Sequence, residues 1–298
     1  MKVSVIVPTY NRPKALKKVI DGLACQTWPP HEIIIADDGS TQETARMLDS
    51  YMNRLPVHHV WQEDEGFRLS RIRNKAILKS RGDYLIMLDG DCIPEKHFVE
   101  DHLTLAEKGC FFQGKRVIVN QKSEPQFTCS DMDSFTRRLV HAMKLDISNS
   151  HHILRIPFWP AHKTPKLSGI RGCNMGFFRK DLVAINGYNQ SIQGWGREDQ
   201  EIVVRLYKYG LKRKENPFKA ICYHLWHMEN SRNNLEKNNK ILENAIASAA
   251  FFCESGLTQW VPANERNMGE RNMGERIMGE RIMDERNMNV ESNMNEID

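Results

Sequence analysis

Short apolar runs alternate with helical stretches along the first half of this chain. Four short stretches predict strands, at residues 3–7, 32–36, 57–61 and 84–88. The stretches between them predict helices, at residues 13–24, 41–52 and 70–80. Regular alternation of strands and helices is typical of an α/β fold, so we expect a single domain whose mostly parallel central sheet is flanked by helices.

The pattern of the second half is less regular. It predicts a helix at residues 197–209, a strand at residues 218–227 and a closing helix at residues 235–252. Residues 121–167 give the weakest prediction. Their aromatic and proline-rich stretch at 156–160 can be a mobile lid, a membrane-touching loop or part of the core, and all three interpretations stay open.

The C-terminal segment repeats a unit of five residues. Asn-Met-Gly-Glu-Arg and Ile-Met-Gly-Glu-Arg recur from Asn267 to Arg281. A period of five matches neither the helical nor the strand period, and the repeated glycine weakens a helix further. We therefore expect residues 264–298 to be a low-complexity, disordered tail without a catalytic role.

Composition indicates an ordinary globular protein of a reducing compartment. The chain has 298 residues, of which 40% are hydrophobic, enough for a full core. Its seven cysteines are odd in number and show no C-x-x-C spacing, which argues against a disulfide framework and a zinc ribbon. The apolar run at residues 3–7 is too short for a signal peptide, and no window approaches 18 apolar residues, so we expect a cytoplasmic protein.

The charge is unevenly distributed along the chain. The net charge is +4, and because the tail carries −4, residues 1–263 carry +8. A moderately basic body suits anionic partners such as a nucleotide sugar, a lipid phosphate or an anionic membrane face. The basic residues do not form a dense stripe interleaved with aromatic residues, so we expect no nucleic-acid partner.

The motif with the clearest chemistry is Asp89-Gly90-Asp91, which directly follows the apolar run 84–88. In open α/β sheets, ligands bind beyond the carboxyl ends of buried strands. Two carboxylates there, separated by a glycine, form a hard-oxygen site suited to Mg²⁺ or Mn²⁺, and the same cation can hold a diphosphate. Taken alone, the motif can also be an acidic turn at a strand end.

Polar residues follow the other three predicted strands as well. They are Pro8, Tyr10, Arg12, Asp37, Asp38, Arg68, Arg73 and Asn74. An aspartate can accept hydrogen bonds from a base or ribose. Arg68 and Arg73 can neutralise phosphate or orient a carboxylate at the site, although capping and surface roles would explain each residue singly. Since the strand ends converge in this topology, the set favours a nucleotide-diphosphate pocket. Neither the G-x-G-x-x-G nor the P-loop signature is present, which argues against a dinucleotide-binding Rossmann domain and a P-loop enzyme.

These motifs carry a family resemblance. Pro8-Thr9-Tyr10-Asn11-Arg12, Asp37-Asp38-Gly39-Ser40, Gly66-Phe67-Arg68 with Arg73-Asn74, and Leu88-Asp89-Gly90-Asp91 resemble the donor half of family 2 glycosyltransferases of the GT-A fold. Gly172-Cys173-Asn174-Met175-Gly176 and Gly194-Trp195-Gly196-Arg197-Glu198-Asp199 are similar to the acceptor half of chondroitin-polymerase domains and β-1,4-galactosyltransferases. The likeness covers about residues 1–240. It implies a donor-binding half at 1–120 and an acceptor-binding half with a closing helix at 121–263. It also implies that Asp89 and Asp91 bind a divalent cation and the donor diphosphate.

In the acceptor half, the resemblance assigns Asp199 as the general base and Glu198 as the residue that fixes the acceptor hydroxyls. The indole of Trp195, beside Gly196 in a glycine-flanked loop, can stack on a sugar ring, and Asn174 is a further candidate acceptor contact. The residues alone leave another interpretation open. In that interpretation Trp195 anchors the core, and the two carboxylates favour the positive end of a helix dipole.

Two histidines end the predicted strand at 218–227. Side chains alternate along a strand, so at most one of His224 and His227 should reach the metal unless the strand breaks between them. By resemblance we assign His224 as a metal ligand with Asp91 and Asp89, and place His227 near the diphosphate; the reverse assignment stays open. An imidazole ligand shifts the preference toward Mn²⁺ over Mg²⁺.

The resulting hypothesis is a metal-dependent, inverting glycosyltransferase. It would move a hexose or N-acetylhexosamine from a UDP-sugar to an oligosaccharide or lipid-linked glycan, as in bacterial-type surface polysaccharide synthesis, with peripheral contact at the inner membrane face left open. Two alternatives are an inactive GT-A scaffold or glycan-binding partner, and a sugar-nucleotide nucleotidyltransferase. The second usually opens with a glycine-rich signature that this chain lacks.

Overall fold

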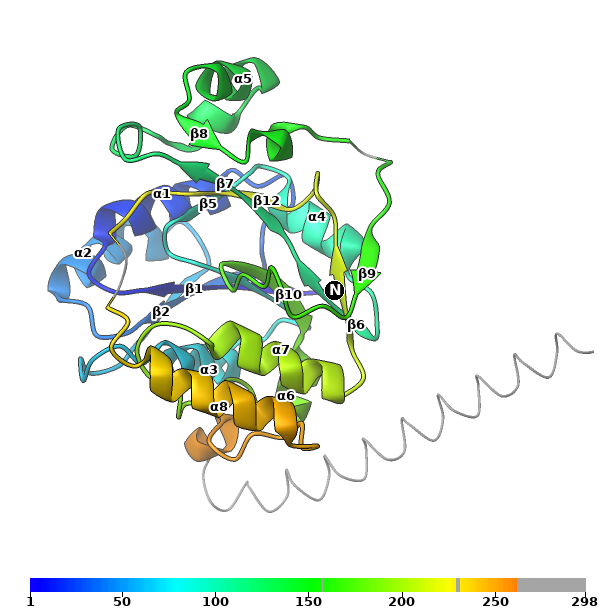
Figure 1. Cartoon of the computed structure of the whole chain (residues 1–298). Coiled ribbons are helices and arrows are strands. Elements are labelled where there is room, and N and C mark those ends of the chain that lie inside the picture. The colour runs from blue at the N-terminus through cyan, green and yellow to red at the C-terminus, as the bar shows by residue number, and fades with distance from the viewer. Residues whose placement is uncertain (157, 229–230, 262–298) are drawn as a thin grey trace, which may run out of the picture. The chain divides into compact units, whose positions relative to one another are not determined.

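A computed structural model describes residues 1–156, 158–228 and 231–261 of the chain (Figure 1). Its contacts divide the chain into one unit from Met1 to Gly256 and a second unit from Leu257 onward. The described part of the second unit contains a short 3-10 helix, η3 (Leu257–Trp260). The predicted disordered tail, 264–298, lies outside the described residues.

The strands and helices of the first half follow the predicted alternation closely. The strands are β1 (Val3–Thr9), β2 (Glu32–Asp37), β3 (Val57–Trp61) and β4 (Tyr84–Leu88). The helices between them are α1 (Pro13–Ala24), α2 (Gln42–Met52) and α3 (Leu69–Lys79). β1, β2 and β4 are buried throughout, which is why each reads as a continuous apolar run in the sequence.

The large sheet has eight strands in the order β3-β2-β1-β4-β10-β6-β11-β9. The later strands are β6 (Cys110–Gln113), β9 (His162–Thr164), β10 (Asn174–Phe178) and β11 (Lys212–Glu215). The first four strands in this order are parallel to one another, as β6 and β11 are, whereas β10 is antiparallel to both β4 and β6. The prediction of a mostly parallel sheet is confirmed, and β10 joins the second half of the chain directly to β4.

A smaller sheet of four strands has the order β5-β12-β7-β8. Its strands are β5 (Cys92–Pro94), β7 (Lys115–Val119), β8 (Ile147–Ser148) and β12 (Ile221–His224). β12 is antiparallel to β5, and His224 pairs with Cys92 in their register. This pairing places the end of β12 beside Asp91, which immediately precedes β5.

The remaining helices surround these sheets. They are α4 (Phe98–Leu105), α5 (Phe135–Met143), α6 (Arg179–Ala184), α7 (Glu198–Lys208), α8 (Leu235–Ala247), η1 (Cys129–Met132) and η2 (Ser150–Ile153). Figure 1 shows α1 and α4 on one face of the large sheet and α3 and α7 on the other, with α8 outside α7. Flanking helices are therefore confirmed on both faces.

Three predicted elements of the second half are shorter than expected. The predicted strand at 218–227 is limited to β12, and the predicted closing helix at 235–252 ends at Ala247, because Ser248 is extended. The predicted helix at 197–209 begins one residue later, since Arg197 has a φ of 81° and cannot continue a right-handed helix. Among the described residues, no helix combines the length and hydrophobicity that a membrane crossing requires.

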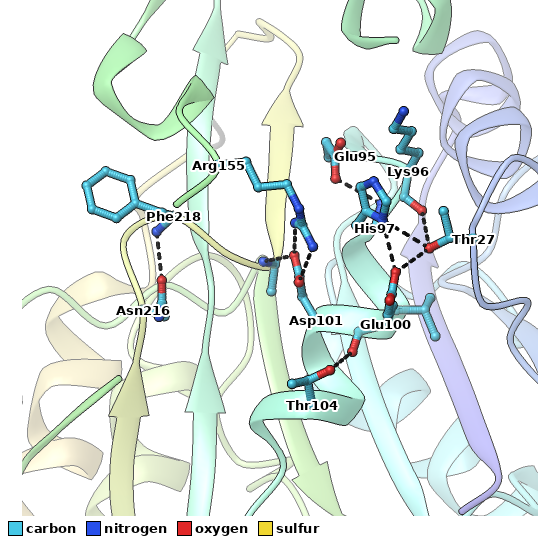
Figure 2. A network of polar contacts seen from close by, with 12 residues as sticks. Thr27, Glu95, Lys96, His97, Glu100, Asp101, Thr104, Arg155, Asn216 and Phe218 are labelled. Atoms are coloured by element: carbon cyan, nitrogen blue, oxygen red, sulfur yellow. Dashed lines mark hydrogen bonds and ion pairs between the residues drawn. The ribbon is translucent and has the colours of Figure 1, made fainter. Parts of the chain in front are cut away.

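A polar network fixes β12 against α4 (Figure 2). The carboxylate of Asp101 on α4 accepts hydrogen bonds from both terminal nitrogens of Arg155, at 2.6 and 2.8 Å, and from the backbone N–H of Ala220 at 2.9 Å. On the other side of α4, Thr27 donates to Glu100 at 2.7 Å. Asp101 is buried, so this bidentate pair determines where the strand that carries His224 begins.

Candidate active site

The loops after β1 and β2 are joined by side-chain capping. Asn11, at a φ of 49°, accepts a hydrogen bond from the N–H of Thr41 through its side-chain oxygen. The N–H of Asn11 in turn donates to the hydroxyl of Ser40 at 2.8 Å. Asn tolerates this left-handed conformation better than most residues, so the sequence specifies the turn that points the following residue, Arg12, toward β4.

A tight turn holds the two carboxylates that follow β4. The N–H of Asp89 donates to the carbonyl of Cys173, and the N–H of Cys92 donates to the carbonyl of Asp89. A Cβ atom at Gly90 would collide with the carbonyl oxygen of Pro8. Only glycine lets the end of β1 approach this turn so closely, and through that contact Pro8 takes part in shaping the site.

Asp91 is the centre of a cluster drawn from three distant segments. Its Oδ2 lies 2.7 Å from Nη1 of Arg12 and 3.4 Å from Nε2 of His227, and its Oδ1 lies 3.7 Å from Nε2 of His224. The strand breaks after His224, and the N–H of Leu225 then donates to the carbonyl of Asp91. Because of this break, both imidazoles face the same carboxylate.

The chemistry of this donor set fits a divalent cation. Neighbouring ligands of an octahedral ion at about 2.1 Å lie about 3 Å apart, close to the separations found here. Burial lowers the pKa of His224 and so favours the neutral imidazole that a metal requires. Nδ1 of His227 donates to the carbonyl of Met228 at 2.8 Å, which leaves Nε2 with its lone pair toward Asp91. The geometry therefore suits both histidines as ligands, and it does not decide between the two assignments.

A second cluster links the other aspartate to the start of α7. Arg73 lies 3.1 Å from Oδ1 of Asp89 and 3.1 Å from Oδ1 of Asp199, two residues that are 110 positions apart in sequence. Its guanidinium also stacks over the ring of Tyr188, 5.1 Å from the centroid. Burial acts to lower the pKa of this arginine, but Tyr188, Asp199 and Asp89 together raise it above its usual value, so the arginine stays charged. Arg73 thus joins the predicted metal motif to the predicted general base.

The carboxylates at the start of α7 differ in their environments. Oδ2 of Asp199 accepts the N–H of Gly172 at 2.9 Å, and a Cβ atom at Gly172 would collide with this carboxylate. Oε2 of Glu198 is buried and makes no hydrogen bond within the described residues. Burial and the neighbouring Asp199 raise the pKa of Glu198 to about 7. Asp199 is therefore oriented by donors, whereas Glu198 is a carboxyl that titrates near neutral pH.

The glycine-flanked tryptophan loop is held from both halves of the chain. The N–H of Gly194 donates to the carbonyl of Phe67 at 2.9 Å, and Asn238 of α8 donates to the carbonyl of Gly196 at 3.0 Å. Trp195 is 39% exposed, and the guanidinium of Arg232 lies 5.1 Å from its ring centroid. An exposed indole on a fixed loop is available for sugar stacking and is not a core anchor.

Three predicted donor-side residues are held by contacts with neighbouring protein groups. Asp37 accepts the N–H of Ser40 and pairs with His59, and Asp38 accepts the N–H of Arg68 and the side-chain amide of Gln62. The guanidinium of Arg68 pairs with Glu65 and donates to the carbonyl of Glu63, so it is not directed at Asp91. Tyr10, by contrast, is an exposed ring whose hydroxyl donates to Asp64 at 2.9 Å.

Two predictions about ligand contacts need correction. Asn74 is fully buried and exchanges two hydrogen bonds with the backbone of Tyr188. Asn174 is also buried, accepts from His102, and donates to the carbonyls of Lys115 and Ala220. All their polar atoms serve the protein's own strands and loops, so these amides are structural. Arg73, by contrast, holds two carboxylates at the site, which is one of the two roles predicted for it.

Sequence reasoning missed several residues that complete the site. Gly172 and Tyr188 orient Asp199 and Arg73, and their only sequence signal was the glycine-rich start of one motif. Three buried cysteines, Cys92, Cys173 and Cys222, also gather behind Asp91, and their scattered spacing gave no signal at all.

Comparisons with known protein families agree with this architecture. The model for glycosyl transferase family 2 matches residues 4–182. A second model, described as the N-terminal domain of galactosyltransferase, matches residues 155–228. The two matches together cover the strand ends, the Asp91 cluster and the start of α7.

Two curated relatives are about a quarter identical to this chain over the aligned residues. Validoxylamine A glucosyltransferase of Streptomyces hygroscopicus subsp. limoneus is 26% identical over 238 residues, which cover 70% of this chain and 48% of that protein. Chondroitin synthase of Escherichia coli is 24% identical over 226 residues, which cover 70% of this chain and 32% of that protein. The chain thus spans about half the length, or less, of these curated relatives.

Solved structures show the same fold. TarS residues 1–349 of Staphylococcus aureus superpose with a TM-score of 0.60 at 20% identity, covering 83% of this chain and 66% of that one. GalNAc-T7 with UDP, GalNAc and Mn²⁺ also gives a TM-score of 0.60, at 17% identity, covering 82% of this chain and 48% of that one. The GT-A-type fold predicted from the sequence is confirmed.

Proposed function

The chain belongs to glycosyl transferase family 2, and from this premise we propose that it transfers a sugar from a UDP-sugar to a hydroxyl of a glycan acceptor with inversion at the anomeric carbon. One observation carries the proposal. Arg73 bridges Asp89 and Asp199, which brings a cation-binding motif and a candidate base into one site. The TarS fragment was also solved with UDP-GlcNAc, which supports a UDP-sugar as the donor class.

Asp91 and His224 would hold Mn²⁺ or Mg²⁺ in this proposal, and His227 would lie near the diphosphate. When bound, such an ion offsets the negative charge that develops on the diphosphate leaving group. Arg12 contributes a further positive charge on the solvent side of Asp91. The GalNAc-T7 structure with UDP and Mn²⁺ supports metal dependence, and the mixed carboxylate and imidazole set favours Mn²⁺.

Asp199 acts as the general base in this proposal. Arg73 and the N–H of Gly172 each occupy one lone pair of its carboxylate and fix its orientation, and the remaining lone pairs can accept the proton of an acceptor hydroxyl. The hydroxyl oxygen then attacks the anomeric carbon from the side opposite the diphosphate. Trp195 stacks on the acceptor sugar, and Glu198 contacts its hydroxyls.

The acceptor class we propose is a surface oligosaccharide, free or lipid-linked. Relatives named chondroitin synthase and hyaluronan synthase support a glycan chain as acceptor. Helix α5 supports peripheral membrane contact, because Phe135, Leu139, Val140 and Met143 are exposed and no residue of this fully described helix is buried. Figure 1 shows α5 on the outer side of β7 and β8, away from the large sheet. Co-sedimentation with anionic and zwitterionic vesicles tests this contact, and recovery in the supernatant with both would refute it.

The central test combines a donor screen with a matched pair of variants. The wild-type chain is incubated with Mn²⁺, an oligosaccharide acceptor mixture and UDP-Glc, UDP-Gal, UDP-GlcNAc or UDP-GalNAc, and UDP release is measured. We expect one donor to release UDP, and Asp199→Asn to reduce the rate about 10²- to 10⁴-fold while retaining UDP binding. Asp49→Asn, an exposed change on α2, should retain the full rate.

The other outcomes separate the alternatives. Consumption or release of pyrophosphate would identify a nucleotidyltransferase. Saturable glycan binding without any UDP release would identify a scaffold or glycan-binding partner. A wild-type rate in Asp199→Asn would remove Asp199 from the role of base.

A further inference from the structure

Three cysteines from distant parts of the sequence meet behind the candidate active site. Cys92 begins β5, Cys173 directly precedes β10, and Cys222 lies on β12. All three are buried, and their Sγ atoms lie within 4.8 Å of one another. The proposed transfer reaction uses none of these thiols.

The sulfur atoms also receive polar contacts, which simple core packing does not require. Nη1 of Arg116 lies 3.7 Å from Sγ of Cys173, and Nδ2 of Asn174 lies 3.7 Å from Sγ of Cys222. Sγ of Cys222 also lies 3.7 Å from the carbonyl of Lys115, to which a protonated thiol donates. N–H donors directed at sulfur stabilise a thiolate, and a neighbouring guanidinium adds a compensating charge.

We propose that Cys92, Cys173 and Cys222 form a binding site for a thiophilic divalent cation of the Zn²⁺ class. Tetrahedral zinc–thiolate bonds of about 2.3 Å place two sulfur atoms about 3.8 Å apart, so the observed cluster needs to contract by about 1 Å at most. Three thiolates and a divalent cation carry a net charge of −1, which Arg116 offsets. The site arises from three strands that fold together, not from a local sequence motif.

This site differs in chemistry from the neighbouring Asp91 cluster. Soft thiolates select Zn²⁺, Cd²⁺ or Cu⁺ over Mg²⁺ and Mn²⁺, which prefer oxygen ligands. Ligand atoms of Asp91 and His224 also lie within 4.8 Å of Sγ of Cys92, so the two groups of ligands share that sulfur. Asp91 is partly exposed, and its side of the cluster gives the cation an entry path. The inference does not rest on the proposed transferase activity.

Cd²⁺ is the probe for the experiment, because cadmium–thiolate charge transfer absorbs in the ultraviolet with an intensity that scales with the number of sulfur ligands. The full chain is used with Cys25→Ser and Cys129→Ser, since these two thiols are accessible at the surface. We expect one Cd²⁺ per chain, an intensity corresponding to three thiolates, and no displacement by excess Mg²⁺. Cys173→Ala and Cys222→Ala should each remove at least a third of the intensity. Cys110→Ala, a buried cysteine outside the cluster, should remove none.

Two results would overturn the proposal. One is the absence of a charge-transfer band in the folded chain. The other is a band of one-thiolate intensity that survives both Cys173→Ala and Cys222→Ala, which would assign the ion to Asp91, Cys92 and His224. If a cluster variant fails to fold by circular dichroism, the ¹¹³Cd chemical shift of the parent chain counts the sulfur ligands without any cluster substitution, and a shift for fewer than three sulfurs would equally overturn the site.

Discussion

Each aspartate of Asp89-Gly90-Asp91 pairs with its own arginine, but the two arginines differ in burial. Arg12 contacts Asp91 at 2.7 Å, and 35% of the arginine side chain is exposed. Arg73 contacts Asp89 at 3.1 Å, and only 1% of the arginine side chain is exposed. The carboxylates do not follow this order, since Asp89 is 33% exposed and Asp91 is 14% exposed, so the contrast between the two pairs lies in the arginines.

The difference separates an exchangeable contact from a fixed one. Arg12 is partly exposed, and ion pairs open to solvent contribute only about 0–1 kcal/mol to stability, so a cation can replace Arg12 at Asp91 with little loss. Breaking a buried pair costs about 3–5 kcal/mol because it leaves a charge without a partner. We infer that Asp91 binds and releases ligands, whereas Asp89, Arg73 and Asp199 form the rigid frame that positions the base.

The largest expected effect comes from a substitution of Asp91. Asp91→Ala removes the carboxylate that Arg12 and both histidines face, so metal-dependent UDP binding and transfer should fall about 10³-fold or more. Calorimetric titration of UDP with and without Mn²⁺ measures the binding, with Asp49→Asn as the control. An unchanged Mn²⁺-dependent affinity would exclude Asp91 as a ligand.

The next largest effect is expected for a substitution of Arg73. Arg73→Met keeps the length of the side chain but leaves Asp89 and Asp199 without their shared cation, so the free energy of unfolding should fall by about 3–5 kcal/mol. Arg12→Met, the matched change at the exposed pair, should lower it by less than about 1 kcal/mol. Urea unfolding at low salt measures both. An equal loss of unfolding free energy in the two variants would show that the two ion pairs do not differ.

The strand ends and the buried arginine differ in how far the sequence predicts them. β1, β2 and β4 could be predicted because buried parallel strands have continuous apolar runs, and the ends of parallel strands converge on one edge. Arg73 was placed in the site with a carboxylate-orienting role as one of two alternatives, but its partner Asp199 was not predicted, because it lies 126 positions away. Which side chain a buried arginine pairs with depends on packing that no local pattern records.

The second half shows the same limit more strongly. β8 and β9 have two and three residues, too few for any period to appear in the sequence. The break after His224 could be named as a condition but not predicted, because the backbone contact from Leu225 to Asp91 depends on the pairing of β12 with β5. The roles of Asn74 and Asn174 were wrong for a related reason. An asparagine that completes buried backbone hydrogen bonds has the same sequence signal as one that contacts a ligand.

A smaller effect is expected for Glu198, whose carboxyl neighbours Asp199 of the rigid frame. The pKa of Glu198 is raised from 4.5 to about 7, so the folded state holds a proton that the unfolded state releases between these values. The burial of Glu198 therefore lowers stability as pH rises from about 4.5 to 7, and the loss is complete above pH 7. Glu198→Gln removes this loss, so it should be about 2–3 kcal/mol more stable than wild type at pH 8 and nearly equal to it at pH 4.

Thermal or urea unfolding across this pH range measures the difference, with exposed Glu243→Gln on α8 as the control. The control should show the wild-type pH dependence. A stability difference between Glu198→Gln and wild type that does not change with pH would show that Glu198 titrates as an ordinary surface carboxyl.

The smallest expected effect returns to Arg12. If a cation replaces the guanidinium at Asp91, then Arg12→Ala removes a competitor, and Mn²⁺ should bind the nucleotide-free chain up to about fivefold more tightly, as expected for a contact worth up to about 1 kcal/mol. Lys14→Ala, a nearby exposed change of the same charge, should alter the affinity much less, because Lys14 makes no such contact among the described residues. Manganese titration followed by electron paramagnetic resonance measures both affinities. Weaker Mn²⁺ binding in Arg12→Ala would mean that Arg12 orients Asp91 for the ion, and the exposed pair would then belong to the frame as much as the buried one does.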